Sequence, residues 1–525
     1  MRWLPDDSGF TYEFIPETDK NTDAYLLNVE TILYSLSSQG NRKKIIFSKE
    51  KNPEIGMKSE DFPEVNFKAE NSTYMFANIA GASYYADYYY APINKIKDDN
   101  ISWKVLYKKE DLVKNFQLSD DNIIFSTSKE APNGKICRIS LKNPNINEFE
   151  TLVEEDSNAV ISDFTLTSEG LFYVKTKNGV SSKLYQLKEN RENEIRLPGA
   201  FGFINLKSKG EKYSDLWIET EGWASKKERY RFDFSTNTFE VENLSEEIEN
   251  NNLNDVVIEE IEIISHDGVK VPLSIIYKKG TKKTGNNSLL INAYGAYQWV
   301  NRPHVYPYLE EWINNNGIYA VAYVRGGGEK GESWYRGGFK KTKFNSWKDL
   351  IACTEYLINE KYTSKEKMSA WGGSAGGITI GRAITERPDL FAAAVIRVGM
   401  FNMVRSEFGS NGKNNIKEFG TVKDSIEFKA LLEMDAYHHI KKGVEYPAIY
   451  LTAGMNDSRV PAWQPAKFAA RLQANSGSNN PILLDVDFEG GHGFEASAEK
   501  KDQELAKIMT FLFWQTGHPD YQPKK

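Results

Sequence analysis

The stretch KMSAWGGSAGGI, residues 367–378, decides the fold expected for this chain. Its short apolar run is typical of a strand, Ser374 follows with a glycine two positions to either side, and a helix-like run comes next. This is the layout of a nucleophile elbow, a turn so sharp that only minimal side chains fit beside the nucleophile. Such a turn holds the Ser374 hydroxyl out at the top of a sheet and points the Ala375 N–H at a developing oxyanion. Taken alone, the stretch is explained equally well as a glycine-rich turn with an incidental serine.

The base that Ser374 requires is sought downstream in the chain. A serine hydroxyl is a poor nucleophile at neutral pH, so it needs a base within hydrogen-bond reach and a third group that orients the base. In α/β hydrolases the acid and then the histidine follow the serine. The histidines after Ser374 are His438, His439, His492 and His518. His492 lies in a glycine-rich loop directly after the strand-like run 482–487, where a general base has exposure and mobility, so we predict it as the base.

The orienting acid is expected at the end of the preceding strand. Residues 448–454 read as a buried strand, and Asp457 lies in the loop after it. Alone, Asp457 could be an ordinary turn-forming aspartate. Three strand ends that carry Ser, Asp and His in this order are, however, improbable by chance. The sequence therefore predicts an α/β-hydrolase domain with a doubly wound, mostly parallel sheet and a Ser374–His492–Asp457 triad.

Further segments, taken with the elbow and in this chain order, resemble the prolyl oligopeptidase family of serine peptidases. They are IISHDGVKVP (263–272), NAYGAY (292–297), YVRGGGEKG (323–331), WYRGG (334–338), RPDLF (387–391), DSRVP (457–461) and GGHG (490–493). Together they cover nearly all of the chain from about residue 257 to its end. The resemblance is therefore far more specific than the serine motif by itself.

The resemblance implies roles for residues of the site. It makes Ser374 the nucleophile, His492 the proton shuttle and Asp457 the group that orients the imidazole. It also makes Tyr294 a phenolic oxyanion donor beside the Ala375 N–H, and a neutral phenol is a good donor to developing negative charge in a water-poor site. The alternative for Tyr294 is an aromatic at a strand end that packs on the core.

Substrate recognition is also implied by the resemblance. Arg459 matches the arginine that holds a substrate backbone carbonyl, although it could instead be a surface arginine paired with a carboxylate. The expected apolar lining of the S1 pocket consists of Tyr297, Met400, Phe419 and Val460. Asn415 stands where the family has a tryptophan that stacks on proline, and losing a flat aromatic removes a large apolar contact. Glu418 alone does not provide the acidic pair expected of the oligopeptidase B branch. Cleavage after proline is thus expected by analogy with the family, although Asn415 replaces the tryptophan that would stack on the proline ring.

Residues 1–250 differ in their sequence pattern from residues 251–525, which form the expected peptidase domain. Polar turn signals precede short aromatic-rich runs such as 10–14, 123–126 and 171–174. Such a recurrence predicts an all-β propeller, and at roughly 40–50 residues per four-stranded blade this length holds about five blades. The family has seven blades and an N-terminal segment before them, so the chain is expected to lack that segment and the first blades, as a natural short variant or a fragment. An incomplete propeller exposes strand edges, and we expect an open propeller or lowered stability.

Composition limits the other classes of function. A net charge of −7 over 525 residues, without a basic stripe, argues against a nucleic-acid partner. No run approaches membrane-spanning length, and the first residues lack the apolar core of a signal peptide, so a cytoplasmic enzyme is expected unless an export signal is missing from the start. Cys137 and Cys353 lie in different expected domains, which predicts no disulfide. No metal-binding spacing is present, and we expect neither a metal nor another cofactor.

The leading hypothesis from sequence is a serine oligopeptidase that hydrolyses short peptides through an acyl-enzyme. The first alternative is an acylaminoacyl-peptidase or esterase with the same triad. The second is an inactive protein in which a shortened propeller misplaces the catalytic loops. Labelling by a fluorophosphonate separates the last alternative from the others, because labelling requires an activated serine.

Overall fold

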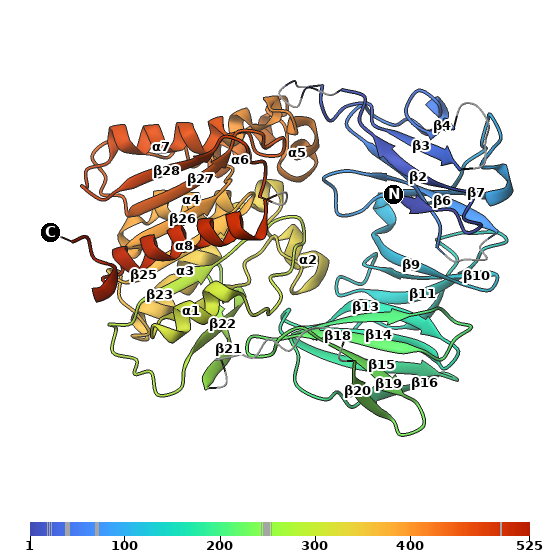
Figure 1. Ribbon diagram of the computed structural model, residues 1–525, viewed down its shortest axis with the longest axis horizontal. Helices are drawn as coiled ribbons and strands as arrows, with labels where there is room; N and C mark the ends of the chain where they lie inside the picture. The colour runs from blue at the N-terminus through green and yellow to red at the C-terminus, as the bar shows by residue number, and fades with distance from the viewer. Residues whose placement is uncertain are drawn as a thin grey trace.

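The structure of the chain is a computed structural model that consists of two parts placed side by side (Figure 1). It describes residues 1–525 except 18, 20–21, 23, 37–41, 69–72, 243, 245–252, 254, 494–495 and 525. The N-terminal part is made of small sheets, and the C-terminal part is a sheet covered by helices. The domain boundary expected between residues 250 and 251 lies outside the described residues, so it stays a prediction.

The described residues of the N-terminal part form five four-stranded antiparallel sheets, which confirms the expected propeller of about five blades. The first contains β1 (Arg2–Trp3), β2 (Gly9–Phe14), β3 (Glu30–Ser35) and β4 (Lys43–Phe47); the second β5 (Phe62–Asn66), β6 (Tyr74–Ala80), β7 (Asp87–Pro92) and β8 (Lys104–Tyr107); the third β9 (Val113–Ser119), β10 (Asn122–Thr127), β11 (Lys135–Ser140) and β12 (Glu150–Val153); the fourth β13 (Val160–Thr167), β14 (Gly170–Lys177), β15 (Ser181–Lys188) and β16 (Arg191–Ile195); and the fifth β17 (Phe203–Ser208), β18 (Leu216–Glu221), β19 (Glu228–Asp233) and β20 (Thr238–Val241).

The turn chemistry of the sequence explains the hairpins of these blades. Asn178, Gly179 and Val180 connect β14 to β15; the first two have positive φ, 53° and 74°, and the Val180 amide donates to the Lys177 carbonyl at 3.1 Å. Two central residues with positive φ give a type I′ turn, whose twist matches that of the flanking strands. Asn and Gly reach this conformation at low cost. The polar turn signals therefore fall between strands, as the sequence predicts.

Consecutive blades are held together by shared apolar clusters. Four clusters join the first blade to the second, the second to the third, the third to the fourth and the fourth to the fifth. In the cluster between the second and third blades, the rings of Phe76 and Phe116 lie 5.1 Å apart, and both are almost fully buried. None of the six apolar clusters found in the described part of the chain joins the fifth blade to the first. These two blades lie at opposite ends of the row of sheets in Figure 1.

The C-terminal part is built on a sheet that has eight strands in the described residues, in the order β21-β22-β24-β23-β25-β26-β27-β28. Its strands are β21 (Val256–Ile264), β22 (Lys270–Lys278), β23 (Leu289–Asn292), β24 (Ile318–Ala322), β25 (Met368–Gly373), β26 (Ala393–Arg397), β27 (Ala448–Gly454) and β28 (Ile482–Asp487). From β24 to β28 every neighbouring pair is parallel, whereas β21 and β22 pair antiparallel. This confirms the expected mostly parallel sheet.

Helices cover both faces of this sheet. The α-helices of this part are α1 (Pro307–Asn314), α2 (Gly331–Arg336), α3 (Phe344–Asn359), α4 (Gly376–Glu386), α5 (Gly412–Phe419), α6 (Ser425–Met434), α7 (Trp463–Asn475) and α8 (Ala498–Gln515).

Short 3₁₀ turns occur in both parts of the chain and are η1 (Pro53–Ile55), η2 (Ile93–Lys95), η3 (Lys109–Asp111), η4 (Lys340–Thr342), η5 (Pro388–Leu390), η6 (Met403–Phe408) and η7 (Pro519–Tyr521). In the described part of the chain, none of the helices combines the length and the apolar character that crossing a bilayer requires.

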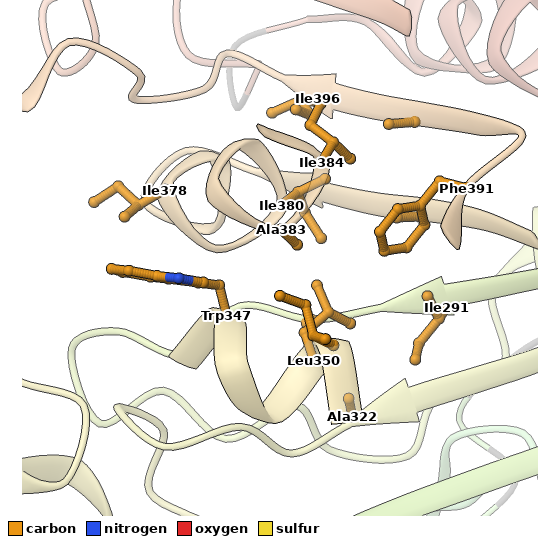
Figure 2. Packing of buried hydrophobic residues seen from close by; sticks show 14 of the residues in the cluster. Ile291, Ala322, Trp347, Leu350, Ile378, Ile380, Ala383, Ile384, Phe391 and Ile396 are labelled. Atoms are coloured by element: carbon orange, nitrogen blue, oxygen red, sulfur yellow. The ribbon is translucent and has the colours of Figure 1, made fainter. Parts of the chain in front are cut away.

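The core of the C-terminal part follows from the alternation of side chains along its strands. In β23, Leu289 and Ile291 face the cluster that contains α3 and α4, whereas Leu290 faces the cluster that contains α1 and α8. Because successive strand residues point to opposite faces, a strand buried on both sides reads as a continuous apolar run. Figure 2 shows the first of these clusters, with Trp347 and Leu350 of α3 packed against side chains of α4.

The two parts of the chain contact each other through polar groups and through Trp223, which packs in the apolar cluster that contains α1 and α8. The Tyr85 hydroxyl donates to Glu332 Oε2 at 2.6 Å, and the Glu332 amide donates to the Pro132 carbonyl at 2.8 Å. Lys417 pairs with Asp61 at 2.9 Å. The second and third blades are therefore linked to α2, and the loop before β5 is linked to α5.

Removing an aromatic ring from between two blades is expected to destabilise the propeller. We predict that Phe116→Ala costs about 3–5 kcal/mol, because it deletes a buried ring and leaves a cavity. Trp3, which is 53% exposed on the first blade, is the control, and Trp3→Ala should have a much smaller effect. Pulse proteolysis across a urea series measures both variants. Equal sensitivity of the two variants would contradict this account of the blade core.

Candidate active site

The turn at Ser374 has the sharp geometry that its glycines indicate. β25 ends at Gly373, Ser374 has φ of +51°, and α4 begins at Gly376. A Cβ on Gly377 would lie 2.7 Å from the Met400 amide nitrogen, so a side chain there would collide with the neighbouring backbone. The Ser374 amide donates to the Arg397 carbonyl at 2.8 Å, which fixes the turn to β26. The strained backbone of Ser374 is thus held by its surroundings.

His492 connects Ser374 to Asp457 by hydrogen bonds. His492 Nε2 lies 3.0 Å from Ser374 Oγ, and its Nδ1 lies 2.6 Å from Asp457 Oδ2. The side chain of Asp457 is fully buried, and that of His492 is 8% exposed. A hydrogen on Nδ1, donated to the carboxylate, leaves Nε2 as the acceptor for the serine hydroxyl. This tautomer is the one that a general base requires.

Asp457 is fixed by the backbone of its own loop. Its Oδ1 accepts from the Arg459 amide at 2.8 Å and from the Val460 amide at 2.9 Å. The other oxygen of the carboxylate is thereby directed to the imidazole. The loop follows β27, and His492 follows β28, which is the neighbouring parallel strand. The three side chains therefore meet because their strands end at the same edge of the sheet.

Tyr294 lies beside Ser374, in the segment that follows β23. Burial raises the pKa of Tyr294 to about 12, while the nearby charge of Arg459 and a hydrogen bond with Ser374 act in the opposite direction. The phenol therefore stays neutral at physiological pH and keeps its donor hydrogen. Ala375 is buried at the start of α4, where the backbone N–H groups form the positive end of the helix. Both expected oxyanion donors thus adjoin the serine.

Of the residues expected to bind the substrate, Met400 adjoins the serine directly, because its amide donates to the Ser374 carbonyl at 3.0 Å. Arg459 is exposed, and its charge acts on the pKa values of both Tyr294 and Tyr297. The apolar residues expected in the S1 pocket belong to one packed cluster and are Tyr297, Met400, Phe419 and Val460. The Tyr297 and Phe419 rings meet edge to face, 5.6 Å apart. Asn415 lies one turn before Phe419 in α5, on the same face, and is 5% exposed.

Two buried charged residues belong to the site although the sequence analysis assigned no role to them there. Glu418 accepts from the Tyr297 amide at 2.8 Å, and the Lys343 ammonium donates to the Gly295 carbonyl. Each side chain is only 1% exposed. The sequence marks Glu418 only as an isolated acid that does not complete an acidic pair, and it does not mark Lys343, which ends the polar run KKTK. Only the packing of distant segments buries them.

Two family models match the chain and together span most of it. The model described as "Prolyl oligopeptidase, N-terminal beta-propeller domain" matches residues 1–243, and the model described as "Prolyl oligopeptidase family" matches residues 304–519. The first match covers the five blades, and the second covers the residues of the site from Ser374 onward.

Relatives among known proteins are prolyl endopeptidases. One from Elizabethkingia meningoseptica is 32% identical over 403 residues, which cover 76% of this chain and 56% of the relative. One from Elizabethkingia miricola is 29% identical over 531 residues, which cover 98% of this chain and 72% of the relative. The chain therefore spans little more than half of the first relative and about three quarters of the second.

Comparison of the fold with solved structures also finds a prolyl endopeptidase. A solved prolyl endopeptidase structure matches 99% of this chain and 75% of its own, with a TM-score of 0.87 at 25% identity. Oligopeptidase B from Leishmania major matches with a TM-score of 0.83 at 20% identity, over 98% of this chain and 71% of its own, which shows the shared fold alone. Because its propeller and its hydrolase sheet are both matched, this chain belongs to the prolyl oligopeptidase family of serine peptidases.

Proposed function

We propose that this protein is a serine oligopeptidase that hydrolyses short peptides through an acyl-enzyme. The observation that carries the proposal is the continuous hydrogen-bonded series from Ser374 through His492 to Asp457. The proposal is supported by the family and by relatives that are prolyl endopeptidases.

In the acylation step, Ser374 Oγ attacks the scissile carbonyl carbon. His492 Nε2 takes the hydroxyl proton as the C–O bond forms, and Asp457 stabilises the resulting imidazolium. The carbonyl oxygen becomes an oxyanion that accepts hydrogen bonds from the Tyr294 hydroxyl and the Ala375 amide. When the C–N bond breaks, the imidazolium gives its proton to the leaving amine.

In the deacylation step, water takes the place of the amine. His492 removes a proton from the water, which attacks the ester carbonyl of the acyl-enzyme. Collapse of the second tetrahedral intermediate breaks the bond to Ser374, whose oxygen receives the proton back from His492. The peptide leaves with a new carboxyl group, and the triad returns to its starting state.

For the residue before the cleaved bond, we propose proline. The support is the apolar cluster beside the serine and the activity named for the relatives. Asn415 on the face of Phe419 offers an amide in place of a second aromatic surface. Arg459, exposed next to Tyr294, is proposed to bind a carbonyl of the substrate backbone.

Removing the nucleophile is expected to abolish hydrolysis without unfolding the protein. Ser374→Ala should lower kcat by a factor of about 10⁶, because the acyl-enzyme can no longer form. Ser369→Ala is the matched control, since Ser369 lies in the strand that leads to Ser374 and its buried hydroxyl has no hydrogen-bond partner among the described residues. Peptide hydrolysis and fluorophosphonate labelling measure both variants. Turnover retained by Ser374→Ala would eliminate this mechanism.

Removing the phenolic donor is expected to affect the transition state more than binding. Tyr294→Phe should lower kcat about 10²- to 10³-fold with little change in KM, as loss of one oxyanion donor does elsewhere. Because burial raises the pKa of Tyr294 to about 12, the phenol stays protonated below that pH. The alkaline limbs of the pH–rate profiles of wild type and variant should therefore coincide up to about pH 10. A limb below pH 10 in wild type that is absent from the variant would contradict the raised pKa, and an unchanged kcat in the variant would contradict the role of Tyr294 as oxyanion donor.

A set of peptides that differ only in the residue before the cleaved bond tests the proposed specificity. Proline should give the highest kcat/KM, because an apolar pocket favours it, and arginine should give the lowest, because its charge would be desolvated without a built acidic pair. Steady-state kinetics with Pro, Ala, Phe and Arg peptides and a simple ester provide the comparison. Strongest cleavage after arginine, or activity on the ester alone, would refute specificity for proline.

A further inference from the structure

The segment 294–298 carries two functional groups on an unfavourable backbone. It presents the hydroxyl of Tyr294 beside the serine and the ring of Tyr297 to the apolar cluster. Gly295, Tyr297 and Gln298 have positive φ of 74°, 58° and 56°. Tyrosine and glutamine rarely adopt this conformation, which costs free energy unless neighbours impose it. Something outside the segment must therefore hold it.

A buried ammonium holds one end of the segment. Lys343 lies directly before α3, is 1% exposed, and donates from Nζ to the Gly295 carbonyl. Ser346 Oγ lies 3.3 Å from the same carbonyl oxygen, but its one hydrogen is donated to the nearer Arg325 carbonyl at 2.6 Å. The carbonyl oxygen of Gly295, the residue after Tyr294, is therefore held by the side chain of Lys343 at the start of α3.

A buried carboxylate holds the other end. Glu418 of α5 is 1% exposed, and its Oε1 accepts from the Tyr297 amide at 2.8 Å. Its Oε2 accepts from the Tyr335 hydroxyl of α2 at 2.5 Å. The next residue, Phe419, packs on the ring of Tyr297. α5 therefore fixes Tyr297 by its backbone and by its ring.

The two charges compensate each other across the segment. Burial lowers the pKa of Lys343 to about 8, and the negative charge of Glu418 acts in the opposite direction. Burial likewise raises the pKa of Glu418, against the positive charge of Lys343 and two hydrogen bonds. A buried charge is costly when it stands alone, and a hydrogen bond to a charged group in a low dielectric is strong and directional.

We propose that Lys343 and Glu418 form a buried clamp of opposite charges that positions the segment 294–298, and through it both the oxyanion donor Tyr294 and the S1 wall Tyr297. The inference rests on the proposed function, since it assigns positioning roles for that reaction. Neither side chain contacts the reacting atoms. Each acts through a backbone group, Lys343 through the Gly295 carbonyl and Glu418 through the Tyr297 amide.

A double-mutant cycle between Glu418 and Tyr294 tests the clamp. Glu418→Gln keeps the shape of the side chain and one acceptor oxygen but removes the charge. In the wild-type background we expect kcat on a proline peptide to fall about tenfold or more and KM to rise. In the Tyr294→Phe background the loss in kcat should largely disappear, because that donor is already absent, while the rise in KM persists through Tyr297. Equal losses in kcat in both backgrounds would overturn the clamp.

Two further variants keep the test decisive if Glu418→Gln does not fold. Tyr335→Phe removes only the hydroxyl that donates to Glu418, and Lys343→Met removes the ammonium. Both should show the same coupling to Tyr294→Phe, with a smaller effect for Tyr335→Phe. Independence of both variants from Tyr294→Phe would overturn the proposal.

A matched control separates positioning from general stability. Tyr362 is a buried tyrosine whose hydroxyl donates to Glu259 Oε2 at 2.6 Å. It precedes the amino end of β25, whereas Ser374 follows the carboxyl end of the same strand. Tyr362→Phe should leave kcat and KM unchanged, and a loss equal to that of Tyr335→Phe would overturn the clamp. Wild-type protein that neither hydrolyses peptides nor reacts with a fluorophosphonate would overturn the proposed function and the clamp together. Activity in wild type without coupling would overturn the clamp alone.

Discussion

The parallel order of β25, β26, β27 and β28 is the constraint on which the site depends. In this order the carboxyl ends of the strands lie at one edge of the sheet, so the loops that follow β25, β27 and β28 meet there. The backbone hydrogen bonds of the ladder set the spacing of these loops. A series of side chains joined at 3.0 and 2.6 Å needs such a rigid support, because small displacements would break it.

The buried charges of Lys343 and Glu418 contribute more to the position of the backbone near the site than to the stability of the fold. Removing Lys343 and Glu418 from water is costly, and a neutral pair of similar volume would cost less. What the charges supply is direction, since each forms a strong bond to one backbone group of the segment 294–298. Tyr335, which bonds to Glu418, shares α2 with Glu332, which accepts from Tyr85 of the propeller. One short helix therefore contacts both the proposed clamp and the neighbouring part of the chain.

The propeller is stabilised in a different way, by apolar packing between neighbouring blades. Among the described residues, four apolar clusters each join two consecutive sheets, so stability is distributed along the row. The periodic turns and aromatic strands predicted this architecture and its number of blades, because each blade repeats the same local chemistry. Which ring packs on which, as Phe76 does on Phe116, depends on how the sheets stack and could not be predicted from local patterns.

The sequence by itself determined the elbow at Ser374, the strand–loop positions of Asp457 and His492, and the two-part architecture. These features rest on local requirements: glycines where a side chain would collide, apolar runs for buried strands, and turn residues with positive φ. The tertiary structure alone decided that the three side chains touch, and that Lys343 and Glu418 are buried against one strained segment. The reason is physical, since a charged residue in a polar stretch is normally solvated, and only the approach of segments distant in the chain removes its water.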